Sequence, residues 1–333
     1  MNIIIVGQGA MGLLWYHNIQ QLMNNHSDYN NAQLHLLSSH QTHSKQEIVS
    51  KVALPHEHYA FTDNKNVIHA GKVNYADMES IQKADLIFLC VKSFQVSSVL
   101  NNISNQLKSD VSIILAHNGM GTLAELPKDI IQKHAVYALL TTHGCFRSAP
   151  LTVKHTGIGF TDVGLVSGEV NLAQQAAITK LLNAALPHVT FHQDIKQKQW
   201  LKLAINCVIN PLTAINDINN GQVNNEEYST IARKLLEEVV AVANIEGVKL
   251  ALSTLEETVT MVANATAQNS SSMRCDILAN RMSEIDYING YIHRLGIKHN
   301  IATPENSKMW QVVKSLSTNK ENDTTKDDIP SHY

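Results

Sequence analysis

Residues 2–12 read NIIIVGQGAMG, and this stretch decides the fold of the first part of the chain. Residues 2–6 are mostly apolar and β-branched, which is typical of a strand buried in a parallel sheet. The residues after the glycines, Leu13-Leu14-Trp15, favour a helix. A strand, a G-x-G-x-x-G turn and a helix in this order predict a dinucleotide-binding unit, and the alternative is a glycine-rich turn with no ligand.

Each glycine of this turn is required for a different physical reason. Gly7 allows the tight turn, Gly9 lets the backbone approach a pyrophosphate, and Gly12 lets the helix pack closely on the strand. The free N–H groups of the helix N-terminus then meet the phosphates. The candidate cofactor-binding residues at this turn are therefore Gly7, Gln8, Gly9, Ala10, Met11 and Gly12.

Residues 33–37 predict the second strand, which runs into Ser38-Ser39-His40. An acidic residue at this strand end holds the ribose 2′-hydroxyl in NAD-type sites, and no acid stands here. Residues 41–83 indicate no clear element, and His143-Gly144 is expected in a turn. Further strands are expected over residues 84–91, 111–116, 135–142, 159–165 and 189–192.

Two polar residues stand just after predicted strands. Lys92 comes after residues 84–91, and Asn118 comes after residues 111–116. Ligands of open α/β sheets bind beyond the carboxyl ends of the strands, so both residues are candidates to reach a cofactor or substrate. The alternatives are a solvated surface lysine and a turn residue that precedes glycine.

From about residue 172 the pattern is helical, and its most informative stretch is WLKLAINCVINPLTAI at residues 200–215. Lys202, Asn206 and Asn210 are spaced by four, so on a helix they form one narrow polar stripe in apolar surroundings. A lysine buried there must be paired, have a lowered pKa, or face a cavity. Pro211 removes the hydrogen bond that the Cys207 carbonyl would accept. The stripe suits either a ligand that needs a proton donor or a purely structural Lys–Asn cluster.

Further helices are expected over residues 231–247, 255–267 and 276–292, with a polar interruption at residues 269–273. Glu284 falls in the last of these, where the alternative to a functional role is a solvated helix face. The sequence therefore predicts an N-terminal Rossmann-type α/β domain, an all-helical C-terminal domain and a flexible tail. Their expected bounds are residues 1–193, 194–317 and 318–333.

The composition narrows the class of protein. The chain has 333 residues, 44% hydrophobic and 17% charged, with a net charge of −3, which favours neither nucleic acid nor an anionic membrane as partner. No apolar run approaches the length of a membrane span. The spacing of the four cysteines matches no metal-binding motif, so no bound metal is expected. The cysteines also indicate a reducing compartment, so a cytoplasmic location is expected. Most of the 17 histidines are expected at the surface.

Four blocks of sequence carry a resemblance to a known family. They are GQGAMG at residues 7–12, HNGMGT at 117–122, WLKLAINCVINPLTAI at 200–215, and SSMRCDI with SEIDYINGY between residues 271 and 291. From residue 1 to about residue 314 the chain resembles the ketopantoate reductase (2-dehydropantoate 2-reductase) family. The resemblance implies a Rossmann domain, a helical domain and NADPH-dependent reduction of 2-dehydropantoate to pantoate in pantothenate and coenzyme A synthesis.

The resemblance also implies roles for individual residues. Lys202 would be the general acid at the keto oxygen and Glu284 a catalytic, substrate-orienting carboxylate. The family's asparagines that contact cofactor or substrate fall on Asn118, Asn206 and Asn210. Its contacts to the substrate carboxylate fall on Asn269 and Ser272, which share a face if their segment is helical. The expected partner is a small-molecule 2-keto acid, and the expected assembly is a monomer or homodimer.

This sequence departs from the family pattern at a position that would contact the 2′-phosphate of the cofactor. Lys92 falls on a family lysine near that phosphate, but bacterial members carry an arginine after the second strand where this chain has Ser39 or His40. Preference for NADPH is therefore expected to depend on Lys92. Two other functions stay open: another β-hydroxyacid dehydrogenase, which shares the lysine four residues before an asparagine, and a non-catalytic dinucleotide-binding sensor. The Asn210-Pro211 step and the SEIDYING block favour ketopantoate reductase over the first.

Overall fold

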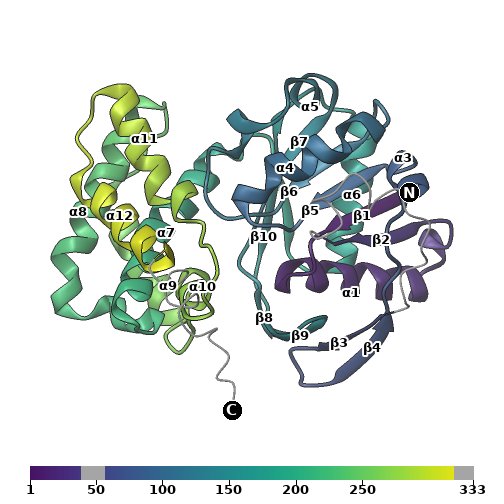
Figure 1. Ribbon diagram of the computed structural model, residues 1–333, viewed down its shortest axis with the longest axis horizontal. Helices are drawn as coiled ribbons and strands as arrows, with labels where there is room; N and C mark the ends of the chain where they lie inside the picture. The colour runs from purple at the N-terminus through teal and green to yellow at the C-terminus, as the bar shows by residue number, and fades with distance from the viewer. Residues whose placement is uncertain (39–56, 319–333) are drawn as a thin grey trace, which may run out of the picture. The chain divides into compact units, whose positions relative to one another are not determined.

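The computed structural model describes residues 1–38 and 57–318, and the chain divides into two compact units (Figure 1). The first unit comprises Met1–His117 and Thr122–Ile195, and the second comprises Asn118–Gly121 and the chain from Lys196 onward. The candidates Ser39 and His40, and the predicted tail after residue 318, lie outside the described residues.

The first unit is built on a seven-stranded sheet with the order β11-β10-β7-β6-β5-β1-β2. The strands from β2 to β7 in this order are parallel, and β10 runs antiparallel to β7. This confirms the predicted Rossmann-type α/β fold. The seven strands are β1 (Asn2–Val6), β2 (Gln33–Leu37), β5 (Leu86–Leu89), β6 (Ser112–Leu115), β7 (Ala135–Thr141), β10 (Thr161–Ser167) and β11 (Val189–His192).

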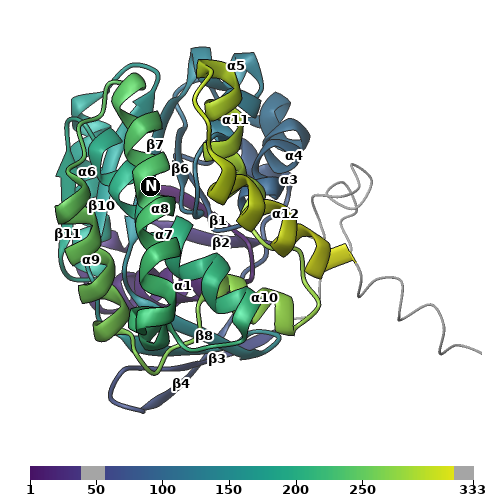
Figure 2. The ribbon, with the colours of Figure 1, turned by 90° about the vertical axis from the view of Figure 1, so that its left-hand side faces the viewer.

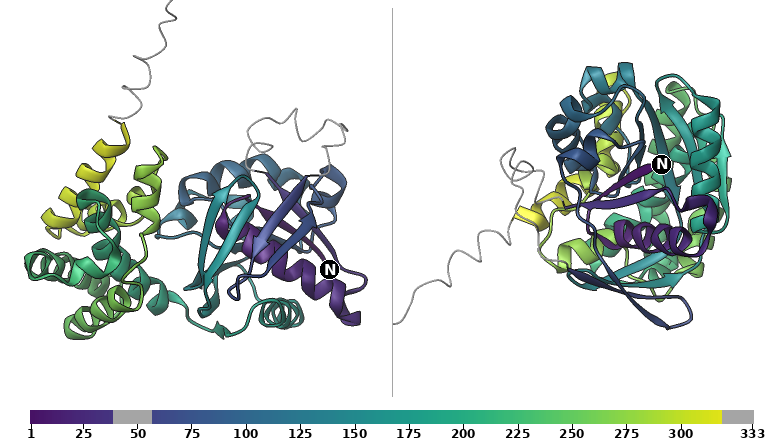
Figure 3. Two further views of the ribbon diagram at one scale, coloured as in Figure 1. Left: turned by 90° about the horizontal axis from the view of Figure 1, so that it is seen from below. Right: turned by 90° about the vertical axis from the view of Figure 1, so that its right-hand side faces the viewer.

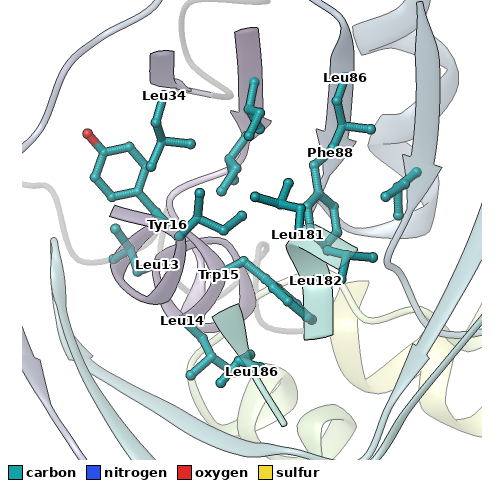
Figure 4. Packing of buried hydrophobic residues seen from close by; sticks show 14 of the residues in the cluster. Leu13, Leu14, Trp15, Tyr16, Leu34, Leu86, Phe88, Leu181, Leu182 and Leu186 are labelled. Carbon is teal, nitrogen blue, oxygen red and sulfur yellow. The ribbon is translucent and has the colours of Figure 1, made fainter. Parts of the chain in front are cut away.

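Helices cover both faces of this sheet, which explains why β1 is apolar from Ile3 to Val6 (Figure 1). Ile3 and Ile5 pack with α1 and α6 on one face, and Ile4 and Val6 pack with α3, α4 and α5 on the other. Figure 4 shows Trp15 of α1 beside Phe88 of β5, and their ring centroids are 5.3 Å apart. The helices are α1 (Ala10–Asn25), α3 (Met78–Gln82), α4 (Ser93–Ile103), α5 (Lys128–Lys133) and α6 (Leu172–Ala185).

A second, four-stranded sheet with the order β4-β3-β9-β8 packs against α1 (Figure 3). The sequence did not predict it, because one side of these strands carries exposed polar residues and their apolar residues are few. The expectation of a turn at His143-Gly144 was wrong for Gly144, which begins β8. The strands are β3 (His58–Thr62), β4 (Ile68–Lys72), β8 (Gly144–Ala149) and β9 (Thr152–Gly157).

The expected surface location of most histidines does not extend to His17, His134, His143 and His155, which are buried. His17 of α1 stacks on Phe61 of β3 with ring centroids 4.0 Å apart, and burial lowers the pKa of His17 to about 4. His143 and His155 are buried as well, and their ring nitrogens lie 3.2 Å apart. Burial lowers the pKa of His143 to about 4, so these rings are neutral packing groups near pH 7.

The second unit is helical and is organised around α7 (Figure 2). The long apolar stretch of the sequence forms this helix, which packs against α8, α9, α10 and α12. Among the described residues no helix is long and apolar enough to cross a membrane. The helices are α7 (Lys196–Asn216), α8 (Glu226–Ile245), α9 (Leu252–Ala265), α10 (Ser272–Leu278), α11 (Asn289–His299) and α12 (Pro304–Thr318).

The helix expected over residues 276–292 was wrong. α10 ends at Leu278, and Asn280 follows with a left-handed φ of 51°. A left-handed residue just past a helix end stops the helix, and the Arg281 N–H bonds back to the Asp276 carbonyl. The chain then makes a 3-10 turn, η5 (Ile285–Tyr287), before α11 begins.

Candidate active site

The glycine turn of the first unit is enforced by the protein's own backbone at two of its three glycines. Gly7 has a φ of +110°, and a Cβ there would lie 2.7 Å from the Cys90 carbonyl oxygen. A Cβ on Gly12 would lie 2.0 Å from the Gly7 carbonyl oxygen. The positive φ and the Cys90 carbonyl at Gly7, and the close packing of α1 on the turn at Gly12, therefore permit only glycine at these positions.

Gly9 is different, because the protein leaves room beside it. The nearest atom to a Cβ on Gly9 would be the Cys90 carbonyl oxygen, 4.0 Å away. Gly9 is also the N-cap of α1, where no side chain caps the helix and no acid lies in the first turn. The N–H groups of Ala10 and Met11 lie at this same helix N-terminus, which suits an anion. The residues present therefore fit the pyrophosphate of a dinucleotide.

Gln8 of the turn is held by residues that the sequence did not single out. Its Nε2 donates to the hydroxyl of Tyr75 at 2.9 Å, and that hydroxyl donates to the Glu57 carboxylate. Tyr75 forms a β-bridge with Leu36 of β2. Glu57 thus adds a carboxylate beside Tyr75, the residue that bridges to β2.

Lys92 lies three residues after the end of β5 and is the N-cap residue of α4. Its backbone N–H donates to the Gln95 side chain at Oε1 over 3.2 Å, and the residue is half-buried. This places Lys92 beyond the carboxyl end of a central strand of the first unit. Asn118 follows β6 in the same manner, but it belongs to the second unit.

The polar stripe of α7 is formed as predicted, but its lysine is not buried. Lys202 and Asn206 are half-buried, and Asn210 is 6% exposed. The expectation of a buried Lys202 was therefore wrong, since the lysine lies towards the more exposed end of the stripe. Burial raises the pKa of the neighbouring Cys207 thiol well above its usual range, so that thiol is a neutral packing group.

Glu284 is only 4% exposed and lies just before η5. This excludes the solvated helix face as its environment. The Asn118 side-chain amide donates to Glu284 Oε2 at 3.4 Å, and the Met120 N–H donates to the Tyr287 carbonyl at 2.8 Å. A Cβ on Gly119 would lie 2.3 Å from that same carbonyl oxygen. The structure thus brings together Asn118 and Glu284, which are 166 residues apart in sequence.

Asn269 and Ser272 are both exposed, which leaves them accessible to a ligand. They do not share a helix face, because α10 begins only at Ser272. Between them, Ser271 is buried as the N-cap of α10, and its Oγ accepts from the Arg274 N–H at 3.0 Å. The Thr213 hydroxyl of α7 also donates to Ser271 Oγ at 2.7 Å, so this segment is fixed to α7.

We predict different defects from replacing these two serines. Ser271→Ala removes the side-chain cap of α10, and the Arg274 N–H loses its acceptor there, so we expect the free energy of unfolding to fall by about 1–2 kcal/mol. Ser272→Ala should keep its stability and raise KM for a keto acid substrate. Thermal unfolding and steady-state kinetics measure both quantities. Equal KM values in the two variants would mean that the substrate carboxylate is held elsewhere.

A Rossmann-type sheet with an intact glycine turn, together with a helical unit that carries a lysine, several amides and a buried carboxylate, defines a two-unit dinucleotide-dependent oxidoreductase. Two protein-family models match the chain. One is described as "Ketopantoate reductase PanE/ApbA" and covers residues 3–168, and the other as "Ketopantoate reductase PanE/ApbA C terminal" and covers residues 194–317. The chain belongs to the ketopantoate reductase family.

Similar proteins agree with this assignment. A 2-dehydropantoate 2-reductase of Vibrio cholerae is 34% identical over 95% of this chain and 98% of its own length. One from Yersinia pestis is 36% identical over 74% of this chain and 78% of its own. Among solved structures, a D-mandelate dehydrogenase with NADH and anilino(oxo)acetate has a TM-score of 0.81 at 22% identity, covering 96% of this chain and all of that one. A ketopantoate reductase from Ralstonia eutropha has a TM-score of 0.78 at 24% identity, with the same coverage. These two structures share the fold.

Proposed function

We propose that this protein reduces 2-dehydropantoate to pantoate with NADPH, as a cytoplasmic enzyme of pantothenate and coenzyme A synthesis. The observation that carries the proposal is the buried Glu284, which accepts a hydrogen bond from Asn118 in the same unit as the Lys202 stripe. A buried carboxylate with an amide partner suits a substrate that offers hydroxyl groups. The curated relatives named 2-dehydropantoate 2-reductase support this substrate.

The residue types of the second unit fit ketone reduction. Hydride addition to the carbonyl carbon leaves negative charge on the oxygen, and a donor must stabilise that charge. The Lys202 ammonium would stabilise it and deliver the proton. When bound at the glycine turn, NADPH would supply the hydride.

The remaining candidates would hold the substrate. Asn206 and Asn210 follow Lys202 along α7 and can hydrogen-bond a polar molecule beside it. Glu284, with Asn118, would accept a hydrogen bond from a substrate hydroxyl. Ser272 and Asn269 would donate to the substrate carboxylate. The partner is thus a small 2-keto acid, bound by a monomer or homodimer.

Cofactor choice yields a prediction about Lys92. Removing a charged contact to the 2′-phosphate loses roughly 1.5–3 kcal/mol, or about ten- to a hundredfold in affinity. We therefore expect wild type to prefer NADPH and Lys92→Ala to lose most of that preference, as measured by kcat/KM for NADPH and NADH. The contrasting variant is Glu57→Gln, which removes a negative charge beside Tyr75 and should raise the preference for NADPH. A wild type that prefers NADH, or a Lys92→Ala enzyme with full preference, contradicts the assignment.

Turnover tests the proposed function directly. Purified protein is assayed with NADPH and 2-dehydropantoate, and separately with a 2-keto acid that lacks the hydroxyl group. The proposal predicts a clearly higher kcat/KM for 2-dehydropantoate. A higher value for the other acid would favour a different β-hydroxyacid dehydrogenase. NADPH binding in a calorimeter without turnover of either acid would favour a dinucleotide-binding sensor.

A further inference from the structure

Pro211 creates a gap in the hydrogen bonding of α7 that another helix fills. The Cys207 carbonyl would normally accept the N–H of residue 211, and proline has none. The side-chain amide of Asn289 donates to this carbonyl instead, at 3.0 Å. Asn289 is the first residue of α11 and is 0% exposed. A bond between two different helices thus replaces a bond within α7.

The orientation of the Asn289 amide is fixed by its neighbours. Its Nδ2 also donates to Asn306 Oδ1 at 3.0 Å. The Asn306 amide nitrogen already has two other acceptors, because it donates to Glu238 Oε2 at 2.7 Å and to the Leu235 carbonyl at 3.1 Å. Asn306 must therefore turn its oxygen towards Asn289. Asn289 in turn presents its nitrogen to both acceptors, so a flipped amide would lose both bonds.

The carboxylate at the end of this network is itself anchored. Glu238 accepts the backbone N–H groups of Glu305 and Asn306, at 2.8 and 2.9 Å, at the start of α12. Hydrogen bonds to an ionised acceptor are stronger than those between neutral groups. The network therefore links Glu238 on α8, Asn306 on α12, Asn289 on α11 and Cys207 on α7, with the Asn289 amide donating towards both ends.

The network is not optimised for stability alone. Asn289 Oδ1 is buried and has no hydrogen-bond partner within the part of the chain that the structure describes. An unpaired buried acceptor carries a desolvation penalty, which an apolar side chain of similar shape would avoid. Unlike such a side chain, Asn289 fixes the position of the start of α11 along α7 through its hydrogen bond to Cys207.

We propose that Asn289 is a positioning residue, which fixes the segment of Glu284 against the part of α7 that carries Asn206 and Asn210. Cys207 lies between these two asparagines. On the other side, Asn289 follows η5, where the Tyr287 N–H donates to the Glu284 carbonyl at 2.9 Å. The bond from Asn289 to Cys207 therefore joins the segment of Glu284 to the part of α7 that carries Asn206 and Asn210. This inference rests on the proposed function.

The first experiment compares two buried asparagines of the same network. Asn289→Leu removes the bond to Cys207, and we expect kcat for 2-dehydropantoate to fall about tenfold, because small misplacements of reacting groups slow turnover. KM for NADPH should stay within about twofold, since the glycine turn lies in the first unit. Asn306→Leu is the matched control. It loses network bonds but leaves the Asn289–Cys207 bond, so its kcat should stay within about threefold of wild type.

Pro211→Ala separates positioning from a merely structural role. It returns an N–H to residue 211, which can pair with the Cys207 carbonyl within α7. In the Pro211→Ala background, Asn289→Leu should therefore cost much less thermal stability but still lower kcat about tenfold. Recovery of kcat together with stability would overturn the proposal, as would a normal kcat in Asn289→Leu alone.

A readout that needs no turnover keeps this inference separate from the proposed function. Wild type is assayed first, and absence of turnover would overturn only the proposed function. Amide hydrogen exchange of Met120 and Tyr287 then tests the positioning role, because both N–H groups bond within the Glu284 segment. Exchange at these two amides should be faster in Asn289→Leu than in Asn306→Leu. Equal rates would overturn the inference.

Discussion

Lys202→Ala is expected to lower kcat for 2-dehydropantoate by about a hundredfold or more, the scale of losing a general acid. The physical reason is that no group would then neutralise the charge that develops on the keto oxygen. NADPH affinity should change little, because Lys202 lies on α7 and the glycine turn belongs to the first unit. Steady-state kinetics and a fluorescence titration with NADPH measure the two effects.

Two further variants refine this test. Lys198→Ala removes an exposed lysine one helical turn earlier on α7 and should leave kcat within about twofold. Lys202→Arg keeps the positive charge, but a guanidinium does not release its proton near neutral pH. It should therefore remain slow while binding substrate better than Lys202→Ala does. A near-normal kcat in Lys202→Ala would remove this lysine from the mechanism.

The elements with strong hydrophobic signals were predictable from the sequence. β1 is buried on both faces, so its apolar run has one explanation. α7 is long and its apolar and polar residues follow the helical period, which also placed Lys202, Asn206 and Asn210 on one stripe. The four-stranded sheet lacks such a signal, because β4 has no buried residue and the sheet depends on pairing between β3 and β9, which lie far apart in sequence.

The contacts around Glu284 could not be predicted for a different reason. The polar and apolar residues between 276 and 292 imitate a helix, and only the left-handed Asn280 reveals the break. The contact with Asn118 depends on the topology of the whole second unit, not on local spacing. Pro211 did give one usable signal, since the unpaired Cys207 carbonyl in a buried helix requires a donor. The sequence alone does not identify that donor as Asn289.

Gly9→Ala is expected to weaken NADPH binding about ten- to a hundredfold without destabilising the fold. The backbone of Gly9, with a φ of −76°, suits alanine, and a Cβ there meets no protein atom closer than 4.0 Å. The new methyl group would instead occupy the space that the pyrophosphate needs at the N-terminus of α1. Displacing one charged hydrogen bond accounts for roughly 1.5–3 kcal/mol, which gives the stated loss of affinity.

Gly12→Ala is the matched contrast, because its methyl group would lie 2.0 Å from the Gly7 carbonyl oxygen. This clash forces α1 away from the turn, so both stability and NADPH affinity should fall. Overpacking of this kind costs about 1–3 kcal/mol or more, and each kcal/mol lowers Tm by about 2–4 °C in a unit of this size. Thermal unfolding and calorimetric titration with NADPH compare the two variants. If Gly9→Ala binds NADPH as tightly as wild type, the cofactor does not approach the backbone at Gly9, and the glycine turn is structural only.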